Sequence, residues 1–231
     1  MEDSKPLSDQ PLINRTSAVR IFALSDTHLA PWPRVPEDID LVLFGGDFYD
    51  GPLLSGLSDD PEDAETNRFL FPDATAQAER KIPPILAVRG NHDWLDLFGF
   101  FDAERDITGK AVLALPDLIV VGVGLAHRSH VQLPTESEVT AVCGMAQRSL
   151  VHLRNSHPLA KVILLSHYPG KLMVSPEEAA SPGWAFDCVD RLARELQATV
   201  TVVGHVHEAF GRSGLFQNVW MPGPEGAILR V

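Results

Sequence analysis

The chain of 231 residues has the composition of a soluble globular protein, with 45% hydrophobic and 22% charged residues, and is long enough for one large domain. Its formal net charge of -12 argues against extended nucleic-acid binding, since a surface that follows the phosphate backbone is basic. A small phosphorylated substrate stays possible, because a bound metal ion can reverse the local sign of charge.

The beginning of the chain and its apolar runs point away from a membrane protein. No apolar run approaches membrane-spanning length, and residues 1–10 lack the apolar stretch of a signal peptide. We therefore expect a cytoplasmic protein. Residues 1–17 contain Pro6 and Pro11 and no periodicity, which predicts a flexible tail before a single domain over residues 18–231.

Three apolar segments in the first half are predicted to be strands, and each one ends in polar residues. The strands cover residues 18–24, 41–44 and 85–88. The polar ends read Ser25-Asp26-Thr27-His28, then Gly45-Gly46-Asp47-Phe48-Tyr49-Asp50, and finally Arg89-Gly90-Asn91-His92-Asp93. Between the last two strands, residues 64–80 are a helix candidate interrupted by a proline. Polar, glycine-containing strand ends suggest a sheet that presents one functional edge.

The second half repeats this pattern. A pair of strands is predicted at 111–115 and 118–124, followed by a helix that begins at Thr135 with a capping box to Glu138. Two further strands, 162–165 and 199–203, end in His167 and in Gly204-His205-Val206-His207. Between them, the spacing of apolar residues from Val189 to Leu196 predicts another amphipathic helix. Residues 209–231 are expected to form antiparallel strands joined by tight turns, and both cysteines, Cys143 and Cys188, to be buried free thiols in helices.

Five strand ends therefore carry side chains of types that can bind metal ions. Any one of them alone is more simply explained as a turn, cap or packing residue, but their joint pattern favours a metal site. In Asp26-Thr27-His28 and in His205-Val206-His207, alternate residues can project to the same side of an extended segment. Carboxylates, imidazoles and one amide, without a thiolate, suit manganese, iron, zinc or cobalt. The set is too large for a single tetrahedral ion, so it favours two adjacent ions, which activate a water nucleophile and clamp phosphoryl oxygens.

The ordered set Asp-x-His, Gly-Asp-x-x-Asp, Gly-Asn-His-Asp, His, Gly-His-x-His resembles the calcineurin-like metallophosphoesterase superfamily, and it spans residues 26–207. The resemblance implies a four-layer α/β/β/α sandwich with two central mixed β-sheets and the active site at the strand ends. It also implies dinuclear-metal-dependent hydrolysis of phosphate mono- or diesters, with a metal-bridging hydroxide as the nucleophile and no covalent enzyme intermediate.

The resemblance further implies a role for each matching residue. The metal ligands would be Asp26, His28 and His207 at the first ion, Asp47 between the ions, and Asn91, His167 and His205 at the second. His92 would stabilise phosphoryl charge or protonate the leaving oxygen, with Asp93 orienting its ring. Asp50 would orient a ligand histidine. Gly51 stands where the Ser/Thr protein phosphatases carry an arginine, which argues against that branch.

Several choices stay open from the sequence. Arg89 could contact substrate phosphate, but a structural salt bridge explains it equally well. Arg128, His127 and His130 could also contact substrate phosphate, but a solvated loop is the favoured explanation for these three. Tyr168, Trp32 and Trp94 could border the pocket or could support its loops.

Small diesters such as cyclic nucleotides and nucleotide-derived monoesters are both plausible substrates. The alternative of another class is a non-catalytic scaffold, as in a retromer subunit of this superfamily. Retention of His92 and of every expected ligand argues against it. The oligomeric state is left open.

Overall fold

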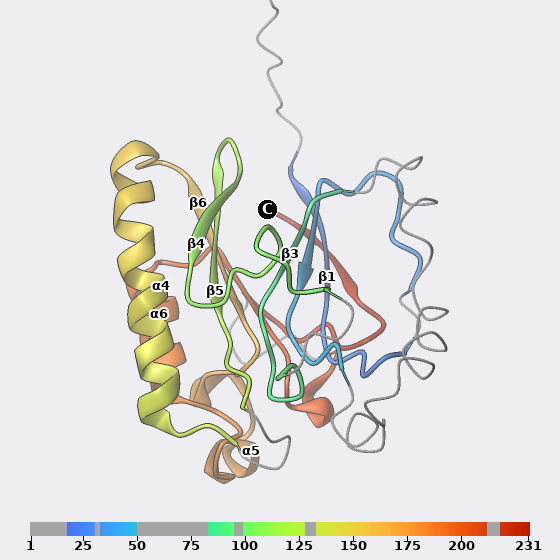
Figure 1. Cartoon of the computed structure of the whole chain (residues 1–231), viewed down its shortest axis with the longest axis vertical. Coiled ribbons are helices and arrows are strands. Elements are labelled where there is room, and N and C mark those ends of the chain that lie inside the picture. The colour runs from blue at the N-terminus through green and yellow to red at the C-terminus, as the bar shows by residue number, and fades with distance from the viewer. Residues whose placement is uncertain (1–17, 31–32, 50–82, 95–98, 128–132, 212–217) are drawn as a thin grey trace, which may run out of the picture.

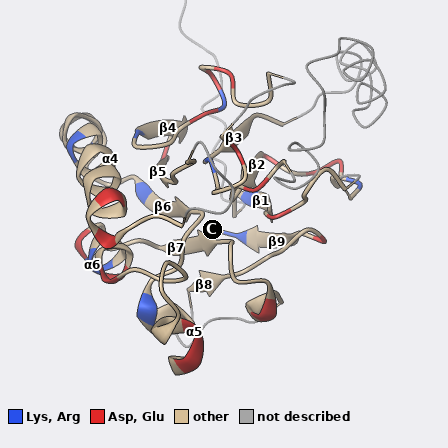
Figure 2. Ribbon diagram, turned by 60° about the horizontal axis from the view of Figure 1, so that its bottom comes forward, with Lys and Arg blue, Asp and Glu red and all other residues tan. Residues whose placement is uncertain are grey.

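The computed structural model describes residues 18–30, 33–49, 83–94, 99–127, 133–211 and 218–231. In this part of the chain, two mixed sheets lie face to face, and helices cover the outer side of one of them (Figures 1 and 2). This arrangement confirms the predicted α/β fold with two central mixed sheets. The predicted tail at 1–17 and the helix candidate at 64–80 lie outside the described residues.

The first sheet has the strand order β3-β2-β1-β9. Its parallel strands are β1 (Arg20–Leu24), β2 (Leu41–Phe44) and β3 (Ile85–Ala87), and β9 (Ala227–Arg230) pairs antiparallel with β1. These strands are short apolar runs because both faces of the sheet are covered. Alternate residues of β1 consequently face different cores: Ile21 packs between the sheets, while Phe22 packs into an aromatic cluster on the outer face.

The second sheet has the order β4-β5-β6-β7-β8. The strands are β4 (Ala111–Leu115), β5 (Leu118–Val123), β6 (Lys161–Ser166), β7 (Val200–Val203) and β8 (Val219–Trp220). β4 and β5 are the pair of strands that the sequence predicts on either side of a Pro116-Asp117 turn, and they pair antiparallel, while the other pairs are parallel.

Helices α4 (Glu136–Ser156) and α6 (Asp187–Glu195) cover the outer face of the second sheet (Figure 1). Thr135 caps α4 through the predicted capping box with Glu138. The apolar stripe of α4 is buried at Val139, Val142, Cys143, Ala146 and Leu150. Cys143 and Cys188 are both buried free thiols, which confirms the prediction. The short elements are η2 (Lys171–Met173), α5 (Pro176–Ala180) and η3 (His207–Ala209).

The prediction for residues 209–231 is wrong in its pairing. β8 is a parallel neighbour of β7, while β9 joins the other sheet beside β1, so the two strands do not form a hairpin. The segment between them crosses from one sheet to the other through Gly223 and Gly226, which have φ angles of 62° and 73°. Glycine-rich apolar pieces identify strands and turns, but they do not identify the partner of each strand.

None of the helices in the described part of the chain is long and apolar enough to cross a membrane.

Candidate metal centre

The polar segments that follow β1, β2 and β3 meet those that follow β6 and β7 where the two sheets come together. The amide of Asp26 donates to the carbonyl of Gly46 at 2.8 Å, which joins the ends of β1 and β2. The amide of His205 donates to Asp26 Oδ1 at 3.0 Å, and this bond joins the first sheet to the second. Residues far apart in the sequence therefore share one site.

Four of the predicted ligands adopt a backbone conformation that L-residues rarely take. Asp26, His28, Asp47 and His205 have φ angles of 55°, 46°, 56° and 71°. Asp and His tolerate the left-handed region better than most residues, but each such residue still costs about 1–3 kcal/mol. The surrounding packing must compensate for this cost, and such strain is common where side chains are held for chemistry.

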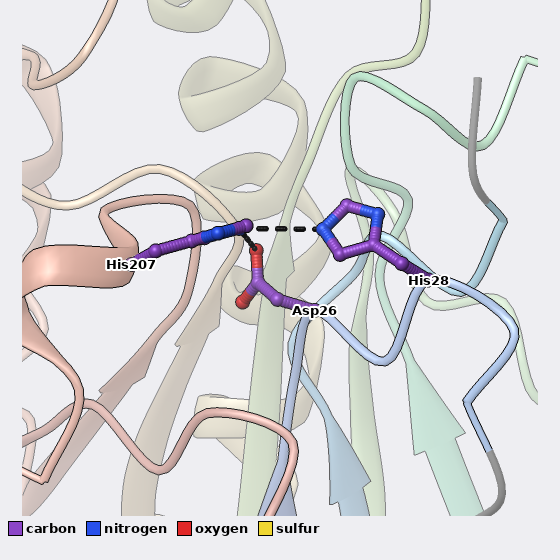
Figure 3. Close-up of side chains that lie close together, drawn as sticks. All are labelled: Asp26, His28 and His207. Carbon is purple, nitrogen blue, oxygen red and sulfur yellow. Dashed lines mark hydrogen bonds and ion pairs between the residues drawn. The ribbon is translucent and has the colours of Figure 1, made fainter. Parts of the chain in front are cut away.

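Asp26, His28 and His207 form the first group of ligand atoms, all within 4.8 Å of one another (Figure 3). His207 Nε2 lies 3.3 Å from His28 Nε2 and 3.5 Å from Asp26 Oδ1. His28 Nδ1 faces the carbonyl of Tyr49 at 3.2 Å, so a proton on Nδ1 leaves the Nε2 lone pair directed at the centre.

The Asp26 carboxylate is suited to bind a cation. The side chain is buried, and burial alone would raise its pKa. The hydrogen bond from His207 is the largest of the effects that outweigh burial and hold the pKa of Asp26 below its ordinary value. A buried carboxylate that stays ionised beside two imidazoles is a favourable environment for a divalent ion.

Asp47, His167 and His205 form a second group on the other side of the centre. His167 Nε2 lies 3.0 Å from Asn91 Oδ1 and 3.5 Å from Asp47 Oδ2, and its Nδ1 faces the carbonyl of Gly45 at 2.9 Å. The ring of His205 is hydrogen-bonded to the backbone of Gly183. Burial lowers the pKa of His167 to about 4 and that of His205 to about 3, so both are neutral imidazoles, the form that binds metal ions, at pH 7.

His28, Asp47 and His92 make up a third group of close ligand atoms. His92 Nε2 lies 3.9 Å from Asp47 Oδ2, and its ring stands edge-on to that of His28 at 5.0 Å between ring centres. Asp47 thus belongs to two groups, and so does His28. The donor set, the buried carboxylates and the backbone carbonyls that hold three imidazoles all fit bound divalent ions.

Asp93 is fully buried, and its partners are backbone amides. Oδ2 accepts from the amides of Asp47 at 2.8 Å and Gly90 at 2.7 Å, and Oδ1 accepts from those of Phe48 at 2.8 Å and Tyr49 at 3.1 Å. These partners differ from the His92 ring that the sequence predicts for Asp93. Burial raises the pKa of Asp93 to about 7, whereas its four donors favour the ionised form, because a protonated carboxyl would need an acceptor.

Arg89 makes structural contacts that include a salt bridge, which is one of the two roles predicted for it; the other is a contact with substrate phosphate. Its Nε donates to Asp106 Oδ2 at 2.9 Å, its Nη1 donates to the carbonyl of Asp93 at 3.0 Å, and its guanidinium lies over the ring of Phe101 at 4.6 Å. Arg89 therefore connects the segment that bears the Gly-Asn-His-Asp motif to residues 101–106, and its side chain is committed to the fold.

The other candidates are distributed as follows. Tyr168 is buried, its ring packs edge-on against His167 and His205, and its hydroxyl donates to the carbonyl of Leu125 at 2.8 Å. His127 Nε2 lies 3.8 Å from Glu138 Oε2 at the start of α4. Trp94 is half-buried. The remaining candidates lie outside the described residues: Trp32, Asp50, Arg128 and His130.

The carbonyls of Gly45, Tyr49 and Gly183 are functional groups that sequence reasoning missed. Each one holds the ring of a candidate ligand histidine. Every residue has a carbonyl, so residue type provides no signal for this role. Gly183 has a φ of 78° in a Ser-Pro-Gly turn, and that turn is the one feature that local sequence could have indicated.

The fold and these side chains define an α/β protein with a candidate centre for divalent metal ions. A family model described as calcineurin-like phosphoesterase matches residues 19–209, and the chain belongs to this family. No curated protein sequence matches the chain.

Solved structures share the fold at low sequence identity. The protein TT1561 of Thermus thermophilus is 15% identical with a TM-score of 0.53, and the match covers 90% of this chain and 91% of that one. A putative 5'-nucleotidase from Staphylococcus aureus, solved in complex with alpha-ketoglutarate, is 12% identical with a TM-score of 0.54. That match covers 93% of this chain and 50% of the nucleotidase chain.

Proposed function

We propose that this protein hydrolyses small phosphate mono- or diesters at a centre of two divalent metal ions. The observation that carries the proposal is the position of Asp47, whose carboxylate belongs both to the group with His167 and His205 and to the group with His28 and His92. A carboxylate shared by neighbouring ligand groups is suited to lie between two ions.

The proposed ligands divide between the two halves of the site. Asp26, His28 and His207 would hold one ion, Asn91, His167 and His205 would hold the other, and Asp47 would contact both. Manganese, iron, zinc and cobalt all suit these donors. When bound, two such ions supply an activated water or hydroxide and neutralise charge on the attacked phosphoryl oxygens.

His92 is proposed to act on the substrate and not to bind a metal ion. Its side chain is 21% exposed, whereas the carboxylate of Asp47 beside it is 2% exposed, so His92 can reach a bound ester. A protonated His92 would donate to the leaving oxygen or to a phosphoryl oxygen. Its main-chain amide donates to Asp47 Oδ1 at 2.9 Å, which keeps the residue close to the centre.

Small esters are the proposed substrates because the acidic chain does not favour an extended nucleic acid. Nucleotide-derived esters belong among them, since one solved structure of the same fold is described as a putative 5'-nucleotidase. A panel of nucleoside monophosphates and cyclic nucleotides would separate monoester from diester preference.

The decisive experiment is hydrolysis of bis-p-nitrophenyl phosphate and p-nitrophenyl phosphate by the purified protein after loading with manganese. Turnover is expected, together with loss of turnover and lower metal content in Asp47→Asn. Turnover and metal content that survive Asp47→Asn would disprove the proposal. Metal binding without hydrolysis of any ester in the panel would favour the non-catalytic scaffold.

His92→Ala separates chemistry from metal binding. The variant should lose turnover and keep its metal, because His92 is proposed to contact the substrate. Loss of metal from His92→Ala would instead make this residue a ligand.

A further inference from the structure

The Asp93 carboxylate joins the two segments that carry the candidate centre. It bonds to three consecutive amides, those of Asp47, Phe48 and Tyr49, in the segment after β2. It also bonds to the amide of Gly90 in its own segment, after β3. The four donor–acceptor distances lie between 2.7 and 3.1 Å. Four hydrogen bonds of this length to one buried side chain hold the two segments together, and we call this arrangement the clamp.

Two of the clamped residues, Asp47 and Tyr49, direct ligand atoms. Asp47 has a positive φ of 56°, a conformation that needs external support, and its amide is held by Asp93. Tyr49 is held by its amide, and its carbonyl faces His28 Nδ1 at 3.2 Å. One side chain thus holds the backbone of Asp47 directly, and it holds His28 indirectly through Tyr49.

We infer that Asp93 is a positioning residue for the metal centre, which acts through the backbone on Asp47 and His28 and not through the ring of His92. This inference rests on the proposed function, because it assigns Asp93 a role in holding the proposed ligands. It differs from a leaving-group role in its prediction: metal affinity depends on Asp93, and that dependence persists when His92 is removed.

An asparagine at position 93 tests the clamp with little change of shape. Its single oxygen can accept from only one of the two amide pairs. If the oxygen takes the Oδ2 position, the amide group of the side chain faces the N–H groups of Phe48 and Tyr49. In the other orientation it faces those of Asp47 and Gly90. Either orientation releases one end of the clamp.

The experiment measures manganese affinity by competition with a chelator, and manganese content by elemental analysis after dialysis. It compares the wild-type protein with Asp93→Asn, His92→Ala and the double variant. Asp190→Asn is the matched control, because Asp190 is also a buried carboxylate, and it accepts the amide of Leu172 at 3.0 Å. Circular dichroism before each titration establishes that each variant is folded.

We expect Asp93→Asn to weaken manganese binding by about 10- to 100-fold, as loss of a group that orients metal ligands generally does. His92→Ala and Asp190→Asn should bind manganese like the wild type, and the double variant should bind it like Asp93→Asn. The inference would be overturned if Asp93→Asn bound manganese as tightly as the wild type does. It would also be overturned if the double variant bound manganese as tightly as His92→Ala does. Either result would leave the proposed function standing. Failure of the wild-type protein to bind any metal would overturn the proposed function as well.

If Asp93→Asn does not fold, hydrogen exchange of the metal-free wild-type protein decides the question. The amides of Phe48 and Tyr49, which donate to Asp93, should exchange slowly in the absence of metal. Exchange at the rate of an unstructured peptide would show that the clamp does not exist without the ions, and the inference would fail.

Discussion

Gly90→Ala should destabilise the protein and reduce its metal content through a steric effect alone. A Cβ at Gly90 would lie 2.6 Å from the amide nitrogen of Asp47 and 2.7 Å from His167 Cε1, and it would also meet Asp47 Oδ1. Cβ atoms do not approach other atoms so closely, so the carboxylate of Asp47 and the ring of His167 must move. Gly90 does not have a positive φ, and the alanine backbone itself is therefore unstrained.

The size of the effect follows from two opposing contributions. Overpacking of a buried site lowers the free energy of unfolding by about 1–3 kcal/mol. Replacing glycine by alanine also raises the free energy of unfolding by about 0.4–1 kcal/mol, because the unfolded chain then has fewer conformations. The net loss of about 1–2 kcal/mol corresponds to a fall in Tm of about 2–8 °C for a domain of this size.

The assay is thermal unfolding of the metal-free protein, followed by measurement of bound manganese. Gly144→Ala is the matched control, since its Cβ would meet only the end of the Arg148 side chain, at 3.3 Å, on helix α4. This control should raise the Tm, because alanine is favoured over glycine in a helix by about 1 kcal/mol. An unchanged Tm and unchanged metal content in Gly90→Ala would refute the close packing of Gly90 against the two ligands.

Three other substitutions have distinct expected outcomes. Tyr168→Phe removes the hydroxyl bond to the Leu125 carbonyl and should lower the free energy of unfolding in urea by about 1–2 kcal/mol, with metal content unchanged because the ring stays. Arg89→Gln should reduce stability and leave KM for phosphoesters unchanged, since Arg89 bonds to Asp106; a higher KM at normal stability would argue for a substrate contact. Burial raises the pKa of Asp190 in the folded protein, so its ionisation weakens folding as pH rises above the ordinary carboxyl pKa of 3.8. The stability of metal-free Asp190→Asn relative to wild type should therefore increase from acidic to neutral pH, and a constant difference would contradict this account.

Much of the fold is readable from the sequence because its local signals agree with one another. The apolar runs predicted at 41–44 and 118–124 form the strands β2 and β5, the second of which ends at Val123. Thr135 with Glu138 caps a helix as predicted, since period, composition and capping act over neighbouring residues. The pairing of β8 with β7 and of β9 with β1 was not readable. Such pairing depends on contacts between distant segments, and glycine-rich pieces of this kind fit either sheet.

The candidate centre likewise has features that could be predicted from the sequence and others that depend on the folded chain. The candidate side chains follow strand ends in the sequence, and the ends of parallel strands meet at one edge, so the candidates could be listed before the fold was known. The resemblance to the family then divided them into proposed ligands and other roles. The distinction between the two predicted roles of Arg89 depended on Asp106 and Phe101, which approach it only in the folded chain.

The sequence by itself determined which side chains can bind metal and in what order they occur, because ligand chemistry belongs to residue type. Only the tertiary structure decided how they are held. The carbonyls of Gly45, Tyr49 and Gly183 orient three imidazoles. The Asp93 carboxylate accepts hydrogen bonds from four backbone amides. Backbone groups are the same in every residue except proline, so their roles depend on where the fold places them.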